Sequence, residues 1–220
     1  MIASDTTRTQ YYIKELIRSE LLPKYVLLLL NDSEDLLPGQ RKNKAGGELM
    51  ALLDKKNIQY DIAPNNDINS NEVARMILNR PESVFIFSGF GGVLLSNKTL
   101  ELGKKFLHVH GGYLPEYKGS TTNFYSLINE NTMGASSIFL TKEIDCGPIL
   151  LRKKFLAPED RTEIDHIHDS KVRSKVLIKT LEKYKKSGRW DVELDDNQGE
   201  TFYIIHPVLK HLAILGGSAE

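Results

Sequence analysis

The sequence is poor in cysteine, in net charge and in long apolar runs. Its 220 residues include one cysteine, Cys146, so no internal disulfide can form. The 29 basic residues are balanced by 29 acidic ones, which argues against a protein that holds nucleic acid through phosphate contacts. The longest apolar run is Tyr25–Leu30, far below the ~18 residues that a membrane span needs. Together with an N-terminus that lacks an export signal, these absences predict a cytoplasmic protein without a membrane partner.

Short apolar strands alternate with amphipathic helices along the first half of the chain. The run Tyr25–Leu30 is apolar on both faces, as in a buried parallel strand, and it follows a helical pattern over residues 6–22. This alternation predicts the α/β class, with an open, doubly wound, mostly parallel sheet and a C-terminal helix. Only Met1–Ala3 precedes the first helix, so we expect a very short edge strand there or none. Helices are expected at 6–22, 45–56, 72–79, 97–103, 122–129 and 162–187, and strands at 25–30, 58–63, 83–88, 106–110, 135–141 and 148–155.

No composition shift marks a domain boundary. We therefore expect one domain over residues 1–220, with a core at about 24–155 and a C-terminal helix and docking tail at about 160–220. The apolar residues at 202–214 favour docking of this tail on the body, and they suit a homo-oligomer interface equally well.

Two predicted strand ends carry unusual residues, and ligands of open α/β sheets bind beyond the carboxyl ends of the strands. The first is Ser88–Val93, a glycine cluster in which the backbone can approach a flat ligand closely. A plain tight turn explains this cluster equally well. It does not match the dinucleotide fingerprint, and no Walker lysine follows it.

The second strand end carries two histidines. Because strand side chains alternate, His108 and His110 point to one face of the predicted strand, and Leu107 and Val109 point to the other. A same-face pair suits acid–base chemistry, and it also suits the ligand set of a metal-dependent hydrolase. Asp145, in a predicted turn, is explained by turn formation alone, but a carboxylate near His110 would raise the pKa of that imidazole.

Residues 107–119 resemble a signature of the N10-formyltetrahydrofolate-dependent formyltransferases, which include glycinamide ribonucleotide, methionyl-tRNA and nucleotide-sugar enzymes. The family pattern is Asn-x-His-x-Ser-x-Leu-Pro-x-Tyr-Arg-Gly, and here His108–Gly119 is His-Val-His-Gly-Gly-Tyr-Leu-Pro-Glu-Tyr-Lys-Gly. Residues 133–138 followed by 145–149 are similar to the second signature, Thr-Gly-x-Thr-x-His and then Asp-x-Gly-x-Ile. Residues 87–95 resemble the segment that cradles the folate in this family.

The resemblance implies a Rossmann-like core that transfers a formyl group from N10-formyltetrahydrofolate to a primary amine of a small acceptor, such as a nucleotide-linked amino sugar. It implies that no metal is used. It assigns catalysis to His110, Asp145 and His108. It assigns folate contacts to Ser88, Gly89, Phe90, Gly91, Gly92, Val93, Leu94 and Ile144, and acceptor contacts to Arg8, Tyr113, Leu114, Pro115, Lys118 and Gly119. A polar helix cap is the alternative role for the segment around Arg8.

In the implied mechanism, protonated His110 and His108 donate hydrogen bonds to the formyl oxygen. Asp145 holds the imidazolium and takes up the amine proton through a water. Three positions depart from the family: His108 replaces asparagine, Gly112 replaces serine and Ile138 replaces histidine. The chain therefore works with a His-His-Asp set, serves a different donor or acceptor, or is an inactive folate-binding homologue. The balanced charge argues against tRNA as the acceptor.

Overall fold

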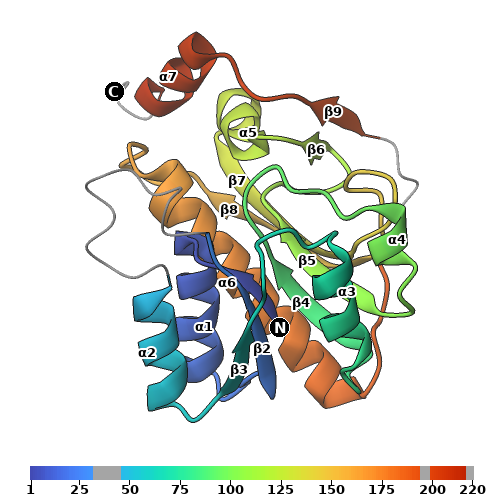
Figure 1. The fold of residues 1–220 in the computed structure, drawn as a ribbon. Coiled ribbons are helices and arrows are strands. Elements are labelled where there is room, and N and C mark those ends of the chain that lie inside the picture. Colours follow the sequence, from blue (N-terminus) through green and yellow to red (C-terminus); the bar gives the residue numbers. More distant parts are fainter. Residues whose placement is uncertain (32–45, 194–198, 217–220) are drawn as a thin grey trace. The chain divides into compact units, whose positions relative to one another are not determined.

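The computed structural model describes residues 1–31, 46–193 and 199–216 (Figure 1). The chain folds into two compact units, which cover residues 1–106 and 107–220. The expectation of one domain over residues 1–220 stays a prediction.

The first unit is built on a parallel sheet whose strands lie in the order β3-β2-β1-β4. All residues of β1 and β2 are buried, as expected for strands that are covered on both faces. The strands are β1 (Ile2–Ser4), β2 (Tyr25–Leu29), β3 (Gln59–Ile62) and β4 (Val84–Ser88).

The first strand corrects one expectation. With the three residues Ile2–Ser4, β1 is as short as the sequence indicates. It is not an edge strand, however, because it pairs with β2 on one side and with β4 on the other. The chain runs outward from β1 to β3 and then returns to the other side of β1, so the carboxyl ends of β1 and β4 form the switch point of this sheet.

The helices of the first unit follow from their apolar stripes. Helix α1 buries Tyr12, Ile13 and Leu16, and the Thr6 side chain caps it by accepting a hydrogen bond from the Thr9 N–H. Strands β2 and β3 are added on one side of β1, and β4 is then added on the other side. Because strand–helix–strand crossovers are right-handed, α3 therefore lies on the sheet face opposite α1 and α2 (Figure 1). The helices are α1 (Thr7–Arg18), α2 (Gly47–Lys55), α3 (Asn71–Leu78) and α4 (Asn97–Leu100).

The second unit has antiparallel pairing. Strand β5 (Lys105–His110), which begins in the last two residues of the first unit, pairs with β7 (Thr132–Phe139), and β7 pairs with β8 (Ile149–Leu156). Helix α6 packs on β7 and β8 and follows a π-helical segment, η1. The remaining elements are β6 (Tyr117–Gly119), α5 (Thr122–Glu130), η1 (Ile164–His168), α6 (Asp169–Ser187), β9 (Glu200–Phe202) and α7 (Pro207–Leu215).

The C-terminal tail contacts the second unit less extensively than its apolar composition suggests. Strand β9 pairs with β6, and buried Arg161 donates to the carbonyl of Ala213 in α7. Ile205 and Ala213 are buried, at 5% and 2% exposed. Several other apolar side chains of the tail are exposed: Tyr203, Ile204, Val208, Leu209, Leu212 and Leu215.

The α/β class with a mostly parallel sheet and a C-terminal helix is confirmed. Among the helices that the structure describes, none combines the length and the hydropathy that crossing a bilayer requires. A cytoplasmic location stays a prediction.

Candidate functional site

His110 and Asp145 lie together in the second unit, although 35 residues separate them in the sequence. The His110 Nδ1 atom is 3.4 Å from Asp145 Oδ1, and the two side chains are only 7% and 10% exposed. The alternation of β5 explains the direction of the imidazole. Leu107 and Val109 are buried on one face of the strand, which turns His110 to the other.

The backbone and the amide of Gly119 hold Asp145 in place. Asp145 has a φ of 54°, a left-handed conformation that aspartate adopts more readily than most residues. Its Oδ2 atom accepts a hydrogen bond of 2.9 Å from the Gly119 N–H, 26 residues away. The carboxylate is therefore engaged with a distant segment, and a purely local turn-forming role does not account for it.

The second imidazole nitrogen of His110 faces a backbone carbonyl. His110 Nε2 is 2.8 Å from the carbonyl oxygen of Tyr117 and 3.5 Å from Thr122 Oγ1. A carbonyl oxygen only accepts hydrogen bonds, so Nε2 carries the proton in this arrangement. In a neutral imidazole this leaves the Nδ1 lone pair facing Asp145, whereas an imidazolium would donate from Nδ1 to that carboxylate.

Burial lowers the pKa of His110 below its ordinary value of 6.5. The Asp145 carboxylate opposes this shift, and the Arg173 guanidinium adds to it. The net direction is opposite to the one expected from the carboxylate alone. Burial therefore favours the neutral imidazole, whereas the Asp145 carboxylate favours the imidazolium.

His108 lies on the same strand and is half-buried. Its backbone pairs with Ile138, the position at which the family signature has a histidine. With the Nε2 proton directed at the Tyr117 carbonyl, Nδ1 is the only His110 nitrogen that could bind a metal, and it faces Asp145. Within residues 1–31, 46–193 and 199–216, no group of three His, Cys, Asp or Glu side chains has a metal-holding arrangement. A metal-dependent hydrolase stays an alternative that the sequence raises.

Close contacts explain why residues 111 and 112 are both glycine. A Cβ on Gly112 would lie 2.6 Å from the Tyr117 carbonyl oxygen and 2.7 Å from His110 Nε2. A Cβ on Gly111 would collide with the side chains of Arg173 and Asp169. The serine that the family has at position 112 therefore does not fit beside the imidazole in this arrangement.

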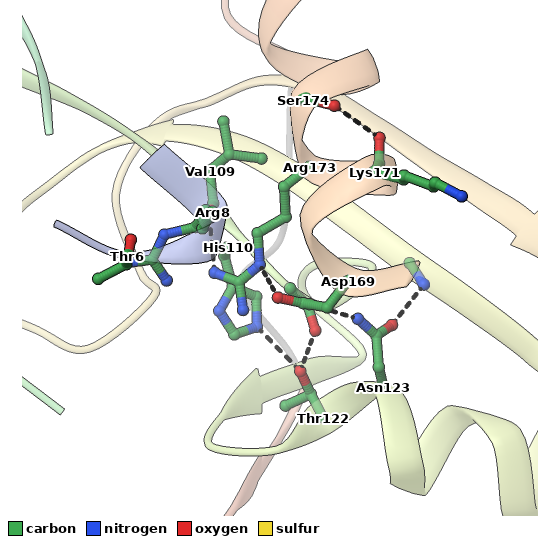
Figure 2. A network of polar contacts seen from close by, with 12 residues as sticks. Thr6, Arg8, Val109, His110, Thr122, Asn123, Asp169, Lys171, Arg173 and Ser174 are labelled. Atoms are coloured by element: carbon green, nitrogen blue, oxygen red, sulfur yellow. Dashed lines mark hydrogen bonds and ion pairs between the residues drawn. The ribbon is translucent and has the colours of Figure 1, made fainter. Parts of the chain in front are cut away.

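Three further polar side chains, none of them predicted from the sequence, surround this strand end (Figure 2). Arg173 pairs with Asp169 in α6, with 2.8 Å between Nε and Oδ2. Its Nη1 donates to the Val109 carbonyl at 3.0 Å. Asn123 of α5 donates to Asp169 Oδ1 at 2.9 Å and accepts from the Gly134 N–H at 2.8 Å. The four-residue spacing of Asp169 and Arg173 was the available signal, but it is also common on solvated helix faces.

The predicted folate segment of the first unit, Ser88–Leu94, divides into a buried and an exposed part. Ser88 is fully buried and its hydroxyl lies 2.8 Å from that of Thr9, so it serves the core. Gly91, Gly92, Val93 and Leu94 are exposed. Gly89 is buried against the ring of Phe87, and Phe90 is half-buried. Ile144, the folate contact predicted in the second unit, is exposed as well, at 51%.

Arg8 contacts this same segment. Its Nη2 donates to the Gly89 carbonyl and its Nε lies 3.5 Å from Ser88 Oγ. The cap that the sequence allowed around Arg8 is formed by Thr6, at the start of α1. In this structure Arg8 supports the glycine turn, and a contact between Arg8 and an acceptor stays a prediction.

The predicted acceptor contacts also divide by burial. Leu114 is 0% exposed and packs with Ile138 and Ile149, so it belongs to the core and its side chain does not reach an acceptor. Pro115 and Lys118 are buried too. Gly119 binds Asp145 through its amide, a role that the sequence did not indicate. Tyr113 is half-buried, and the cations of Arg152 and Lys154 lie 5.1 and 5.0 Å from its ring.

Known proteins share this fold and sequence pattern. A methionyl-tRNA formyltransferase of Mycoplasmopsis pulmonis is 30% identical over 175 residues, which cover 77% of this chain and 58% of that protein. The structure of a sugar N-formyltransferase from Shewanella sp FDAARGOS_354 has a TM-score of 0.64 at 16% identity and covers 100% of this chain and 87% of that one. Phosphoribosylglycinamide formyltransferase from Bacillus halodurans has a TM-score of 0.60 at 15% identity, over 86% and 96% of the two chains.

At such identities the two structures establish the fold alone. The chain spans between 32% and 58% of the length of the first three curated relatives that it matches, all of them methionyl-tRNA formyltransferases. The model of the family described as "Formyl transferase" matches residues 1–180. This match covers most of the chain and includes both signatures, and the protein belongs to the formyl transferase family.

Proposed function

We propose that this protein transfers a formyl group from N10-formyltetrahydrofolate to a primary amine of a small acceptor. The observation that carries this proposal is the buried pair of His110 and Asp145, whose facing atoms are 3.4 Å apart. Both residues occupy the positions that the family signatures reserve for histidine and aspartate. A metal is not part of the proposal.

Formyl transfer needs a hydrogen-bond donor for the negative charge that develops on the formyl oxygen. The Nε2–H of His110 is a suitable donor, and it would exchange the Tyr117 carbonyl for the formyl oxygen. His108 supplies the second donor, in place of the family's asparagine. One well-placed donor contributes about 3–4 kcal/mol to such a reaction.

The attacking amine must also lose a proton. His110 Nδ1 and Asp145 Oδ1 face each other with room for one shared proton, because Nε2 already carries its own. The pair therefore acts as the general base, directly or through a water, and it returns this proton to N10 as the bond between N10 and the formyl carbon breaks and tetrahydrofolate leaves. The lowered pKa of His110 favours this role, because it favours the neutral imidazole, which can accept a proton.

The exposed segment Gly91–Leu94 supports the proposed donor binding. It follows β4 at the switch point of the parallel sheet, where open α/β sheets bind their ligands. A Cβ on Gly91 would meet no atom within 4 Å, so packing does not explain the glycine, whereas the approach of a flat ligand to the backbone would. Val93 and Leu94, at 37% and 60% exposed, offer apolar surface for a pterin ring.

A nucleotide-linked amino sugar is the acceptor that we favour. The balanced charge gives no excess of phosphate-binding groups for a tRNA. Sugar N-formyltransferases are among the structures with this fold, which is compatible with a small acceptor. The curated relatives are methionyl-tRNA formyltransferases, so methionyl-tRNA is the alternative acceptor that the assay must include. Whether the protein forms a homo-oligomer stays a prediction.

The test is a donor assay with a panel of acceptors. N10-formyltetrahydrofolate would be incubated with the protein and with amino-sugar nucleotides, glycinamide ribonucleotide or charged methionyl-tRNA, and tetrahydrofolate and the formylated product would be quantified. We expect tetrahydrofolate release that depends on an amino-sugar nucleotide. If methionyl-tRNA alone were formylated, the proposed acceptor would be wrong and the proposed reaction would stand. Donor binding without transfer to any amine would contradict the proposal and favour an inactive folate-binding homologue.

A further inference from the structure

We infer that Arg173 is a positioning residue of this site, which acts with Asp169 and Asn123 to fix the strand end that carries His108 and His110. The inference rests on the proposed function, because it assigns a purpose to the network by its effect on the reacting imidazole. None of the three side chains belongs to the motifs that identify the family.

The guanidinium of Arg173 contacts the backbone on both sides of His110. Its Nη1 donates to the carbonyl of Val109, the residue between the two histidines. Its Nη2 occupies the space beside Gly111 that a side chain would otherwise take. Hydrogen bonds from a charged donor are about twice as strong as neutral ones, so this contact holds the strand end more firmly than an ordinary backbone bond.

A second set of bonds fixes the guanidinium itself. Asp169 pairs with Arg173 at 2.8 Å, and its other oxygen accepts from Asn123 at 2.9 Å. Asn123 in turn accepts from the Gly134 N–H in β7, the strand that pairs with β5. The network thus links α6, α5 and β7 to the residues around His110 (Figure 2).

The side chains of Arg173 and Asp169 are only 16% and 17% exposed, so this ion pair is shielded from solvent more than a surface pair. Isolated surface pairs contribute little, but a partly buried pair with further hydrogen bonds holds a fixed geometry. The pair also requires glycine at position 111, since a Cβ there would collide with both of its members.

The pair also acts on the charge of His110. The groups that face this imidazole are Asp145 from the turn between β7 and β8, Asp169 and Arg173 from α6, the Tyr117 carbonyl from β6 and the Thr122 hydroxyl from α5. Arg173 lowers the pKa of His110, whereas Asp169 raises it. The two members of one ion pair therefore have opposite effects on the same titration.

Because Arg173 and Asp169 shift the pKa of His110 in opposite directions, a titration of His110 distinguishes a positioning role from a purely structural one. In the full chain, the His110 titration would be followed by NMR in the wild type, in Arg173→Met, in Arg173→Lys and in Asp169→Asn, with His110→Ala to identify the signal. We expect the midpoint to rise in Arg173→Met, to fall in Asp169→Asn and to stay near the wild type in Arg173→Lys. Arg189→Met is the matched control, because Arg189 pairs with Asp191 and its side chain is 80% exposed.

Formyl-transfer kinetics supply the second readout. Arg173→Lys keeps the charge but loses the planar fork, so we expect kcat to fall about tenfold while the KM for the donor changes little. If Arg173→Met does not fold, Arg173→Lys and Asp169→Asn still carry the test. A His110 midpoint that moves in the same direction, or not at all, in the Arg173 and Asp169 variants would overturn the inference. Opposite shifts in a protein that transfers no formyl group would support the network and refute the proposed reaction.

Discussion

Gly91 and Gly92, in the turn after β4, have open space where a Cβ would lie, with no atom within 4 Å, whereas Gly111 and Gly112, after β5, would each direct a Cβ into polar groups. Gly92 is required by its φ of +78°, a conformation that side chains rarely adopt. The two glycine-rich strand ends therefore have glycine for different reasons. The first strand end has open space around its glycines, and the second makes room for the protein's own imidazole and ion pair.

Gly112→Ala is expected to have the largest effect in this comparison. The new Cβ would lie within 2.6–2.8 Å of the Tyr117 carbonyl, His110 Nε2 and Thr122 Oγ1, so the imidazole must move. A displacement of about 1 Å in a reacting group costs on the order of a hundredfold in rate. We expect such a loss in kcat for formyl transfer, together with destabilisation of about 1–3 kcal/mol from overpacking. Wild-type kinetics in this variant would show that the imidazole does not occupy this position during the reaction.

Gly111→Ala should have a smaller effect on the reaction, because it displaces Arg173 and Asp169 and not the imidazole itself. We expect about a tenfold loss in kcat and an unchanged affinity for the donor. The effects of Gly111→Ala and Arg173→Met should not add in the double variant, since both release the same ion pair. Fully additive losses in kcat would separate Gly111 from the network.

Gly91→Ala tests the open strand end. The φ of Gly91 is not in the left-handed region and no atom crowds the position, so the thermal midpoint should stay equal or rise slightly. If the backbone of this turn receives the donor, the Kd for N10-formyltetrahydrofolate should increase several-fold, as measured by titration calorimetry. Unchanged donor affinity would leave the segment as a plain turn. Gly47→Ala, at another open position that lies in α2, is the matched control.

The smallest expected effect is on the pH dependence of stability. Because the pKa of His110 is lowered in the folded protein, the unfolded chain binds more protons below pH 6.5. The contribution of this group to stability is therefore complete above pH 6.5 and is lost as the pH falls toward the lower folded value. His110→Gln should remove this part of the acid sensitivity in urea unfolding between about pH 5 and 8. If the free energy of unfolding changed equally with pH in the wild type and in His110→Gln, the lowered pKa of His110 would be contradicted.

The two strand ends also separate what the sequence could predict from what it could not. The helices and strands follow from apolar periodicity, as in α1, where Tyr12, Ile13 and Leu16 recur at helical spacing and are buried. The internal place of β1 could not be predicted, because strand order depends on which edges pair and three residues carry no such signal. The sequence left docking and an interface open for the tail, because apolar composition does not say which side chains find a partner within the chain.

Within the site, only residues that lie in the two family signatures could be predicted. His110 and Asp145 were predicted to act together from the two signatures, and they lie in contact. Leu114 stands inside the same signature but serves the core, because a motif does not distinguish a side chain that packs from one that binds. Arg173 and Asp169 were missed, since their pairing with β5 depends on how α6 packs in the second unit. The pKa of His110 was expected to rise because burial cannot be seen in a sequence.

The decisive experiment for the His110–Asp145 pair is the single-turnover rate of formyl transfer at saturating donor, measured in Asp145→Asn and in His110→Ala. Asparagine can still accept the Gly119 hydrogen bond, so Asp145→Asn removes the charge and the base with little change in shape. We predict a loss of about a thousandfold in each variant, with donor affinity close to that of the wild type. Asp191→Asn and exposed His166→Ala should transfer formyl at the normal rate. A wild-type rate in either Asp145→Asn or His110→Ala would contradict the assignment of this pair as the reacting groups.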